Sequence, residues 1–482
     1  MAKITLSLVI HNHQPVGNFD FVFAEATERA YDPMLEALEH HPAVRLALHY
    51  TGPLLDWLTA NRPDHLERLR GLVTRGQVEL LTGAYYEPIL VVIPDADKVG
   101  QIRKMTRFLR ETFGCEATGV WLAERVWEPH LPKPLVEAGV RYALLDDTHF
   151  KMVGLTDDDL FGPYVTEEQG HSLTVFGNSM YLRYAIPWHP VEDVIGWLRQ
   201  QANAHPGGVA VMGDDGEKFG LWPSTWEHCW GEGAWMERFF AALEANAGWL
   251  ETCPPGKGAA ERVSLGRVYL PCASYEEMMH WALPPDDFTR LARIRRELQE
   301  QHRDDVLRFV KGGLWRTFLA RYDEVNQLHK KMLWVSRKVH RMAEGEEKAR
   351  ALDHVWAAQC NCGYWHGLFG GIYLFHIRVA NYAHLIAAEA LADGEKGCPS
   401  LPLWGKARPG AGWIRVERGD LDADGREEII LNSDRQVLVF KPSYGGALVE
   451  WDWRERRYNM LNAMARRREG YHAELVTAAE EG

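Results

Sequence analysis

The sequence of 482 residues has little that would place it in a specialised class of protein. No stretch approaches the roughly 18 consecutive apolar residues of a membrane-spanning helix. The N-terminal segment MAKITLSLVIHNHQP contains a single apolar run, which is too short for a signal peptide. Acidic residues outnumber basic ones, and a formal net charge of −13 argues against nucleic acid or an anionic membrane as a partner.

Cysteines and phosphate-binding motifs are also scarce. The seven cysteines are scattered, and an odd number without a secretory signal predicts reduced thiols in the cytoplasm. Cys360 and Cys362 have no second cysteine pair at zinc-site spacing. Gly216-x-x-x-Gly220 is followed by Leu-Trp, where a phosphate-binding loop needs Lys-Ser/Thr. We therefore expect a cytoplasmic protein with a neutral or small ligand.

The chain does have a regular alternation of short apolar runs and helical segments. Several runs are continuously apolar and β-branched, as strands buried on both faces should be. Strands and helices that alternate at this spacing predict parallel βα units. Seven or so strands indicate an α/β fold with an incomplete barrel over residues 1–285. The expected strands occupy residues 4–10, 44–49, 78–83, 118–123, 141–146, 173–176, 208–213 and 267–270.

The pattern changes after about residue 285. Residues 286–397 contain long, charged, amphipathic stretches, which predict a helical bundle. A Pro- and Gly-rich joint covers residues 398–412, and four β-rich runs follow it. Because four strands are too few to close a β-sandwich, we expect residues 398–482 to form a linker and a partial β-sandwich.

Polar residues gather immediately after the expected strands. In a parallel barrel these strand ends lie on one rim, where such barrels keep their active sites. The rim has many carboxylates with aromatic neighbours, which suits the cleavage of glycosidic bonds by a pair of carboxyl groups. The polar clusters begin at His11, Tyr85, Trp121, Asp146 and Asp214.

A rival chemistry starts from His11 and His13. Two histidines one residue apart on a strand point to the same side and could bind a metal ion for hydrolysis. They could equally hydrogen-bond sugar hydroxyls, and we place sugar binding first and packing last. The 19 tryptophans are mostly expected in the core, although an indole can also stack on the apolar face of a sugar.

The order of the motifs is more specific. Seven segments resemble the ordered motifs of glycoside hydrolase family 57, and they are HNHQP, GAYYEPIL, WLAERVWEP, DDTHF, GDDGEKFG, YLPCASYEEMMHWALP and QCNCGYWHGLFGG. The resemblance covers residues 10–371 and is strongest to the branch of 4-α-glucanotransferases and α-amylases. It implies a (β/α)7 barrel, a helical domain that completes the active site, and a retaining double displacement.

The resemblance also implies the catalytic pair. The first Glu of the WxxExxW motif is Glu124, the implied nucleophile, and the Asp before Gly-Glu is Asp215, the implied general acid/base. From the residues alone, an ion pair with Arg125 explains Glu124 about equally well. Asp214 is the alternative to Asp215 as the general acid/base, and Glu128 is the alternative to Glu124 as the nucleophile. A retaining pair should have its carboxyl groups about 5–5.5 Å apart.

Further roles follow from the same resemblance. Residues expected to bind hydroxyls of the sugar at the cleavage point are His11, His13, Glu87 and Glu217. Residues expected to line the cleft are Trp121, Trp222, Trp365 and His366. Core packing explains Trp121 almost as well. Residues interpreted as structural supports, and left outside the site, are Ser274, Tyr275 and Glu277.

An acidic loop in the tail is a separate signal. In DLDADGREEIIL, alternating aspartates precede a glycine, as in a calcium loop. Leu431 stands where an EF-hand needs Glu, which excludes that motif. An Asp-rich turn is slightly favoured over a structural calcium site, whose ligands would be Asp420, Asp422, Asp424 and Glu428.

The sequence thus favours a retaining 4-α-glucanotransferase that acts on α-1,4-glucans without a catalytic cofactor. The alternatives are an α-amylase, a metal-dependent carbohydrate deacetylase that uses His11 and His13, and a non-catalytic sugar-binding protein. We expect an α-glucan as the ligand, neither nucleic acid nor membrane as a partner, and a homodimer as a candidate assembly.

Overall fold

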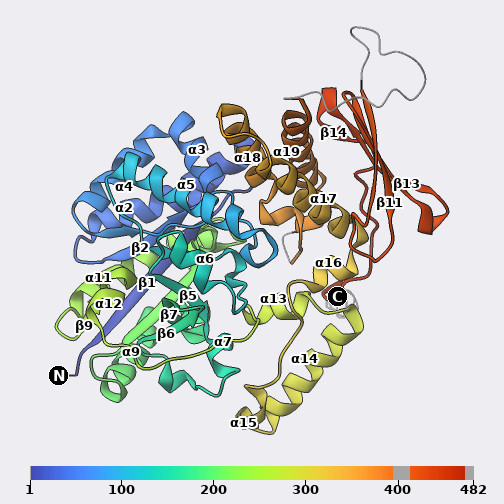
Figure 1. Ribbon diagram of the computed structural model, residues 1–482. Coiled ribbons are helices and arrows are strands. Elements are labelled where there is room, and N and C mark those ends of the chain that lie inside the picture. Colours follow the sequence, from blue (N-terminus) through green and yellow to red (C-terminus); the bar gives the residue numbers. More distant parts are fainter. Residues whose placement is uncertain (1, 368–369, 395–412, 473–482) are drawn as a thin grey trace, which may run out of the picture. The chain divides into compact units, whose positions relative to one another are not determined.

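The computed structural model describes residues 2–367, 370–394 and 413–472, and the chain divides into two compact units (Figure 1). The first unit contains most residues up to His280 together with Phe288–Trp315. The second contains Pro15–Gly17, Trp281–Asp287 and the chain from Arg316 onward. The linker predicted over residues 398–412 lies outside the described residues.

The first unit has an α/β fold with a parallel sheet at its centre. Strand β1 is buried along its whole length and pairs with β2, β8 and β9, while β3 extends the sheet beyond β2. All these pairings are parallel. The strands are β1 (Ile4–Asn12), β2 (Leu46–Tyr50), β3 (Val78–Leu80), β8 (Val209–Asp215) and β9 (Leu250–Thr252).

A second sheet belongs to the same unit. Strands β4, β5 and β7 are parallel, and β6 runs antiparallel to β7 at the edge. A parallel bridge joins Thr82, beyond β3, to Val120 of β4. At the other side, the Ser179 N–H donates to the carbonyl of Val211 at 2.9 Å. The strands are β4 (Gly119–Val120), β5 (Tyr142–Asp146), β6 (Pro163–Glu168) and β7 (His171–Asn178).

The buried strands were predictable, and the partly exposed ones were not. Seven of the eight expected strands are confirmed as β1 to β5, β7 and β8. The strand expected over residues 267–270 is wrong, because Arg267 forms only an isolated bridge to Val165. Strands β6 and β9 were not expected, because the polar edge strand β6 and the three-residue strand β9 both lack a continuous apolar run.

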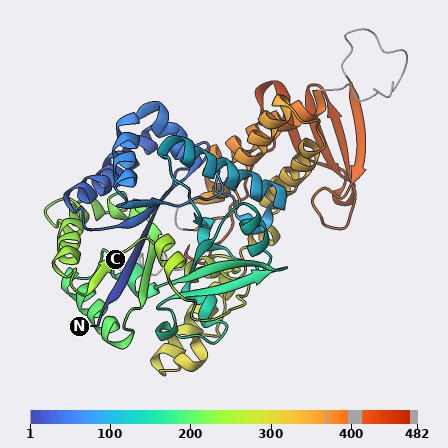
Figure 2. The same cartoon turned by 60° about the vertical axis from the view of Figure 1, so that its left-hand side comes forward.

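Helices lie outside the strands of the first unit in both views (Figures 1 and 2). The ends of helix α5 follow from its local sequence. The carboxylates of Asp95 and Asp97 lie in its first turn, where they interact favourably with the positive end of the helix dipole, and Gly114 ends the helix at φ +68°. The helices are α1 (Asp20–Ala26), α2 (Asp32–His40), α3 (Gly52–Asn61), α4 (Pro63–Thr74), α5 (Asp95–Phe113), α6 (Pro132–Glu137), α7 (Asp147–Lys151), α8 (Met180–Ala185), α9 (Val191–Ala204), α10 (Thr225–Cys229), α11 (Trp235–Ala245), α12 (Pro255–Glu261), α13 (Glu276–Trp281), α14 (Pro285–Glu300) and α15 (Asp304–Leu307).

The core of the first unit is shared by strands of both sheets. Apolar burial of this kind is the main favourable contribution to folding. The cluster includes Trp121, which is 2% exposed, so the indole packs in the core as well as standing next to the rim. Its members are Val9, Ala47, Leu81, Trp121, Tyr142, Leu144, Phe176, Val209 and Val211.

The second unit combines helices with an antiparallel sheet in the order β10 to β14. The four strands expected in the tail are confirmed as β10 to β13. Lys331 of α17 forms buried ion pairs with Glu389 of α19 and with Glu450 and Asp452 of β13. The elements are α16 (Thr317–Arg321), α17 (Asp323–His340), α18 (Glu346–Ala358), α19 (Phe375–Gly394), β10 (Ile414–Gly419), β11 (Glu428–Ser433), β12 (Gln436–Lys441), β13 (Ala447–Trp453) and β14 (Tyr458–Asn459).

Within the described parts of the chain, every helix is too short or too polar to cross a lipid bilayer.

Candidate active site

Polar residues converge at the carboxyl ends of the parallel strands. The register pairs His11 of β1 with His49 of β2 on one side and with Asp215 of β8 on the other. Parallel strands end at the same edge of a sheet, so side chains distant in sequence meet there. The predicted rim cluster is therefore assembled around the end of β1.

Glu124 lies in the one-turn helix Ala123–Arg125, shortly after β4, in an unusual backbone conformation. Its φ is +52°, and that of the next residue, Arg125, is +46°. Such left-handed conformations are uncommon for residues other than glycine and cluster at functional sites. The Ser274 hydroxyl donates to the carbonyl oxygen of Glu124 at 2.5 Å, which holds this turn in place.

The carboxyl group of Glu124 is partly buried and has a defined partner. The hydroxyl of Tyr275 donates to Oε2 of Glu124 at 2.6 Å. Burial, and next the charge of Asp215, raise the pKa of Glu124 to about 7, whereas Arg125 and the Tyr275 hydrogen bond act in the opposite direction. Glu124 and Asp215 therefore interact electrostatically, although their carboxyl separation stays a prediction.

The two adjacent aspartates of β8 have different surroundings. Asp214 Oδ2 lies 2.7 Å from Lys218 Nζ, and Asp214 Oδ1 lies 3.7 Å from Arg183 Nε. Burial acts to raise the pKa of Asp214, but these cations lower it overall. Burial and the charge of Asp214 raise the pKa of Asp215. Asp214 is thus held as an anion in an ion-pair network, whereas Asp215 has the raised proton affinity of a general acid.

Glu87 connects the two histidines of the first motif. Its φ is +50°, and its Oε1 lies 2.9 Å from His11 Nε2, while Oε2 contacts His13 Nδ1. Burial opposes the charge of Glu87, but both histidines lower its pKa well below the usual value. His11 also lies 2.8 Å from His49, between their Nδ1 atoms, and stacks on Trp121 with ring centroids 4.7 Å apart.

Glu217 lies in the one-turn helix that follows β8. The Tyr31 hydroxyl and the Gln14 amide donate to its Oε1 at 2.7 and 3.1 Å. Burial raises the pKa of Glu217 to about 7, although His13 opposes this shift. Glu217 therefore interacts electrostatically with His13 and Asp215, and its role in binding sugar hydroxyls stays a prediction.

The tryptophans and histidine expected to line the cleft are distributed over both units. Trp222 follows Glu217 in the first unit, and its N–H donates to the Glu217 carbonyl at 3.2 Å. Trp365 and His366 belong to the second unit. There the Trp365 indole donates to Asn361 at 2.7 Å, and the buried His366 ring lies 2.7 Å from the Tyr322 hydroxyl. Their role in the cleft stays a prediction.

Several residues of the site were missed by sequence reasoning. Tyr275, which was interpreted only as a support, contacts the Glu124 carboxylate itself. Tyr31, His49 and Arg183 were not considered, because their contacts join distant elements and follow no local pattern. The single usable signal was that Tyr275 lies inside one of the quoted motifs.

The acidic loop of the second unit brings three carboxylates together. Ligand atoms of Asp420, Asp422 and Glu428 lie within 4.8 Å of one another. Glu428 is 1% exposed, and its Oε1 has no hydrogen-bond partner among the described residues. Asp424 instead pairs with Lys441 at 2.7 Å, and Lys441 also contacts Asp422. The loop thus brings together carboxylate oxygens that could bind a cation, and the Lys441 ammonium already compensates part of their negative charge.

Comparisons with known proteins identify the family of the chain. The model of glycosyl hydrolase family 57 matches residues 7–264. The models of the middle and C-terminal domains of α-amylase/4-α-glucanotransferase match residues 313–392 and 420–482.

Three similar proteins cover nearly the whole chain. Alpha-amylase 1 of Dictyoglomus thermophilum is 44% identical over 100% of this chain and 68% of its own length. A 4-alpha-glucanotransferase of Thermococcus kodakarensis is 40% identical over 100% of this chain and 70% of its own. The crystal structure of 4-alpha-glucanotransferase from Thermococcus litoralis matches with a TM-score of 0.89 and 39% identity, covering 98% of this chain and 70% of that one. The chain therefore belongs to glycosyl hydrolase family 57.

Proposed function

We propose that the protein is a retaining 4-α-glucanotransferase that acts on α-1,4-glucans such as maltooligosaccharides, starch and glycogen. The observation that carries the proposal is the partly buried pair Glu124 and Asp215, which interact electrostatically in a family 57 enzyme. The match to a solved 4-alpha-glucanotransferase over 98% of this chain supports transfer as the main reaction.

In the first step, Asp215 donates its proton to the glycosidic oxygen while Glu124 attacks the anomeric carbon. A covalent β-glucosyl ester with Glu124 forms, and the leaving chain departs with the proton. The surroundings favour this division of roles. Arg125 and Tyr275 stabilise the anion of Glu124, whereas the charge of Asp214 favours a proton on Asp215.

In the second step, Asp215 removes a proton from the acceptor, whose oxygen attacks the anomeric carbon, breaks its bond to Glu124 and releases the carboxylate. Two inversions restore the α configuration. If the acceptor is the 4-hydroxyl of another glucan, the product is a lengthened chain. If the acceptor is water, the glucosyl ester is hydrolysed and the glucan is shortened. The shape of the cleft selects between the two acceptors.

We also propose that the parallel strands of the first unit form an incomplete (β/α)7 barrel. Two contacts between the sheets support it, the bridge between Thr82 and Val120 and the hydrogen bond between Ser179 and Val211. The antiparallel sheet of the second unit is likewise proposed to be part of a β-sandwich.

Incubation with maltotriose tests the function. Oligosaccharides longer than maltotriose are expected from the wild-type protein and absent with Glu124→Gln. Glucose and maltose alone would identify an α-amylase. Glucan remodelling that persists in Glu124→Gln would refute the assignment of the nucleophile.

The deacetylase alternative is not favoured, because the chain belongs to a glycosyl hydrolase family. In the proposed enzyme, His11, His13 and Glu87 bind sugar hydroxyls through their mutually oriented ring nitrogens and carboxylate. Activity on maltotriose that survives EDTA is the expected result. The cytoplasmic location and the homodimer stay predictions.

A structural calcium ion is proposed for the acidic loop of the second unit. Its ligands would be Asp420, Asp422, Asp424 and Glu428. The unpaired oxygen of buried Glu428 supports a cation, since calcium prefers carboxylate oxygens.

A further inference from the structure

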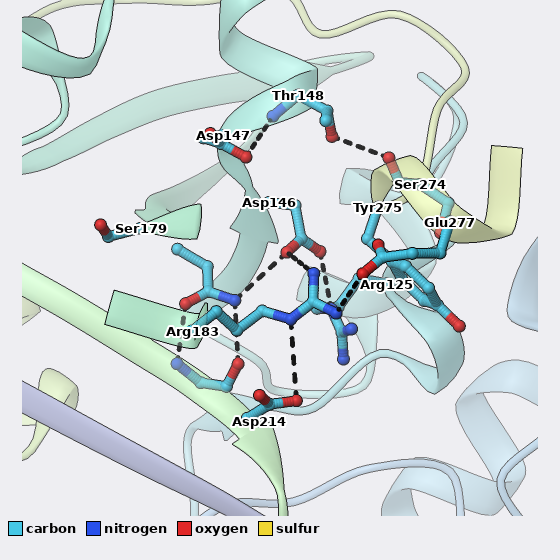
Figure 3. A network of polar contacts seen from close by, with 12 residues as sticks. Arg125, Asp146, Asp147, Thr148, Ser179, Arg183, Asp214, Ser274, Tyr275 and Glu277 are labelled. Atoms are coloured by element: carbon cyan, nitrogen blue, oxygen red, sulfur yellow. Dashed lines mark hydrogen bonds and ion pairs between the residues drawn. The ribbon is translucent and has the colours of Figure 1, made fainter. Parts of the chain in front are cut away.

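Four charged side chains of alternating sign link the segments that carry the catalytic residues (Figure 3). Arg125 Nε lies 2.6 Å from Asp146 Oδ2. The other oxygen of Asp146 lies 3.8 Å from Arg183 Nη1, and Arg183 Nε lies 3.7 Å from Asp214 Oδ1. All four side chains are at most 13% exposed. The series therefore runs from the turn after β4, through the end of β5 and α8, to the end of β8.

Each end of this series is next in sequence to a catalytic carboxylate. Arg125 follows Glu124, and Asp214 precedes Asp215. The two ends differ in sign, so they act on the two catalytic groups in opposite directions. Arg125 favours ionisation of Glu124, and Asp214 favours protonation of Asp215.

Arg183 is the link on which the series depends. It lies on α8, whose N-terminus is capped by the Ser179 hydroxyl. Besides the two aspartates, its Nη2 lies 3.1 Å from Glu277 Oε1, and its guanidinium stands over the Tyr275 ring at 5.2 Å. Its carbonyl oxygen accepts a hydrogen bond from Lys218, the other cation that pairs with Asp214.

We propose that Arg183 is a positioning residue that fixes the nucleophile and the general acid/base relative to each other, an inference that rests on the proposed function. Towards Glu124 it acts through Tyr275, whose hydroxyl bonds the nucleophile. Towards Asp215 it acts through Asp214. One rigid guanidinium thereby joins the supports of both catalytic groups.

A purely stabilising role explains this arrangement less well. Buried ion pairs contribute little net stability, because desolvation of the charges offsets their attraction. A planar guanidinium can bond several carboxylates in a fixed geometry, whereas a lysine ammonium is a single point charge on a flexible chain. The arrangement is better explained by the need to hold the catalytic carboxylates in a fixed position, since a small misplacement of reacting groups lowers the rate steeply.

The charge of Arg183 also has a separate, measurable effect on Asp215. Burial and Asp214 raise the pKa of Asp215, and Arg183 is one of the cations that oppose the rise. Loss of that cation raises the pKa of Asp215 further, while Lys218 at 2.7 Å keeps Asp214 ionised. The charged and titratable groups that interact with Asp215 are His11, Glu124, Arg125, Arg183, Asp214 and Glu217.

Two variants of the full-length protein separate position from charge. Arg183→Gln should lower kcat for maltotriose about 100-fold, with KM little changed, because substrate contacts remain. Its alkaline limb of kcat/KM should move to higher pH, since Asp215 must be protonated in the first step. Arg183→Lys restores the charge without the planar fork. It should return the alkaline limb to the wild-type pH while kcat stays low.

Arg199→Gln is the matched control, because the Arg199 guanidinium stands 3.6 Å over the Trp249 ring in the same unit. It should leave kcat and the pH profile unchanged. Unfolding midpoints are recorded for every variant. An Arg183→Gln protein with a lower midpoint but wild-type kcat and pH profile would overturn the proposal.

A wild-type kcat in Arg183→Lys would overturn it as well, even if the Gln variant did not fold. Failure of the proposed function has a different signature. In that case the wild-type protein itself forms no products from maltotriose, whereas failure of this inference leaves the wild type active.

Discussion

The hydroxyl of Tyr275 donates a 2.6 Å hydrogen bond to the carboxylate of Glu124 from 151 positions further along the chain. Burial and the charge of Glu124 raise the pKa of Tyr275, so its hydroxyl remains a donor around neutral pH. The hydrogen bond is strongest to the Glu124 anion. Tyr275 therefore favours the form of Glu124 that attacks the sugar.

Removal of this hydroxyl should make Glu124 a weaker nucleophile near neutral pH. In Tyr275→Phe the pKa of Glu124 rises from its value of about 7, because a contact that lowers it is lost. Since Glu124 must be ionised, the acidic limb of kcat/KM moves to higher pH. Loss of a hydrogen bond to a charged group should lower kcat/KM near neutral pH about tenfold or more. The measurement is the pH profile on maltotriose.

Tyr269→Phe is the control for this prediction. The Tyr269 hydroxyl donates to Glu167 at 2.8 Å on an exposed surface of the same unit. Its loss should leave the profile unchanged. An acidic limb that does not move in Tyr275→Phe would show that Tyr275 is only a support.

Asp215 and Asp214 should respond in opposite ways to the same substitution. Asp215→Asn should lower kcat by about 10²–10⁴ through loss of the general acid/base. Its unfolding midpoint should not fall, because the substitution removes a charge that burial and Asp214 disfavour. A substrate with a fluoride leaving group, which needs no proton, should recover the first step.

The main effect of Asp214→Asn should instead be a lower free energy of unfolding. The substitution leaves the buried ammonium of Lys218 and the guanidinium of Arg183 without their shared carboxylate. Breaking a buried pair in this way costs about 3–5 kcal/mol. Chemical denaturation measures the difference. If Asp214→Asn were the inactive, stable variant, the two roles would have to be exchanged.

How much of this could be predicted depends on the range of the interactions. The buried strands β1, β2 and β5 were predictable, because burial on both faces leaves a continuous apolar run. Their ends placed the polar clusters on one edge. Nothing local distinguishes Glu124 from Glu128, and only the family motif made that choice.

The remaining parts of the site depend on contacts that sequence patterns do not record. The turn at Glu124 needs φ +52°, which no local signal requires. Arg183 meets Glu277 from 94 positions away, and Asp214 is distinguished from Asp215 by Lys218 and Arg183. Such partners become neighbours only through the fold.

Calcium should stabilise the protein through the acidic loop. A ligand that binds only the folded state raises its stability, by about 2.7 kcal/mol at 100 times the dissociation constant. Addition of CaCl₂ should therefore raise the unfolding midpoint, and Glu428→Gln should abolish the rise. Lys441→Met should enlarge it, because Lys441 competes for Asp422 and Asp424. Equal midpoints with CaCl₂ and with EDTA would leave the loop as an Asp-rich turn.

Lys331 should matter for the stability of the second unit and for its dependence on pH. Its ammonium lies 3.2, 2.7 and 2.6 Å from carboxylate oxygens of Glu389, Glu450 and Asp452. Lys331→Met leaves these buried groups without their cation, at a cost of about 3–5 kcal/mol at neutral pH. Lys330→Met is the matched control, because burial lowers the pKa of Lys330 and its charge is not favoured.

The sign of the pH effect follows from Glu389. Burial acts to raise its pKa, but Lys331 and Lys338 lower it overall. A lowered pKa contributes stability above the unfolded-state value, and this contribution is lost as the pH falls. The wild type should therefore lose this contribution of Glu389 on acidification from neutral pH. The variant lacks part of this contribution, so its deficit should shrink towards acidic pH. A deficit that stays constant from neutral pH to about pH 4 would show that Lys331 acts through packing of its aliphatic stem.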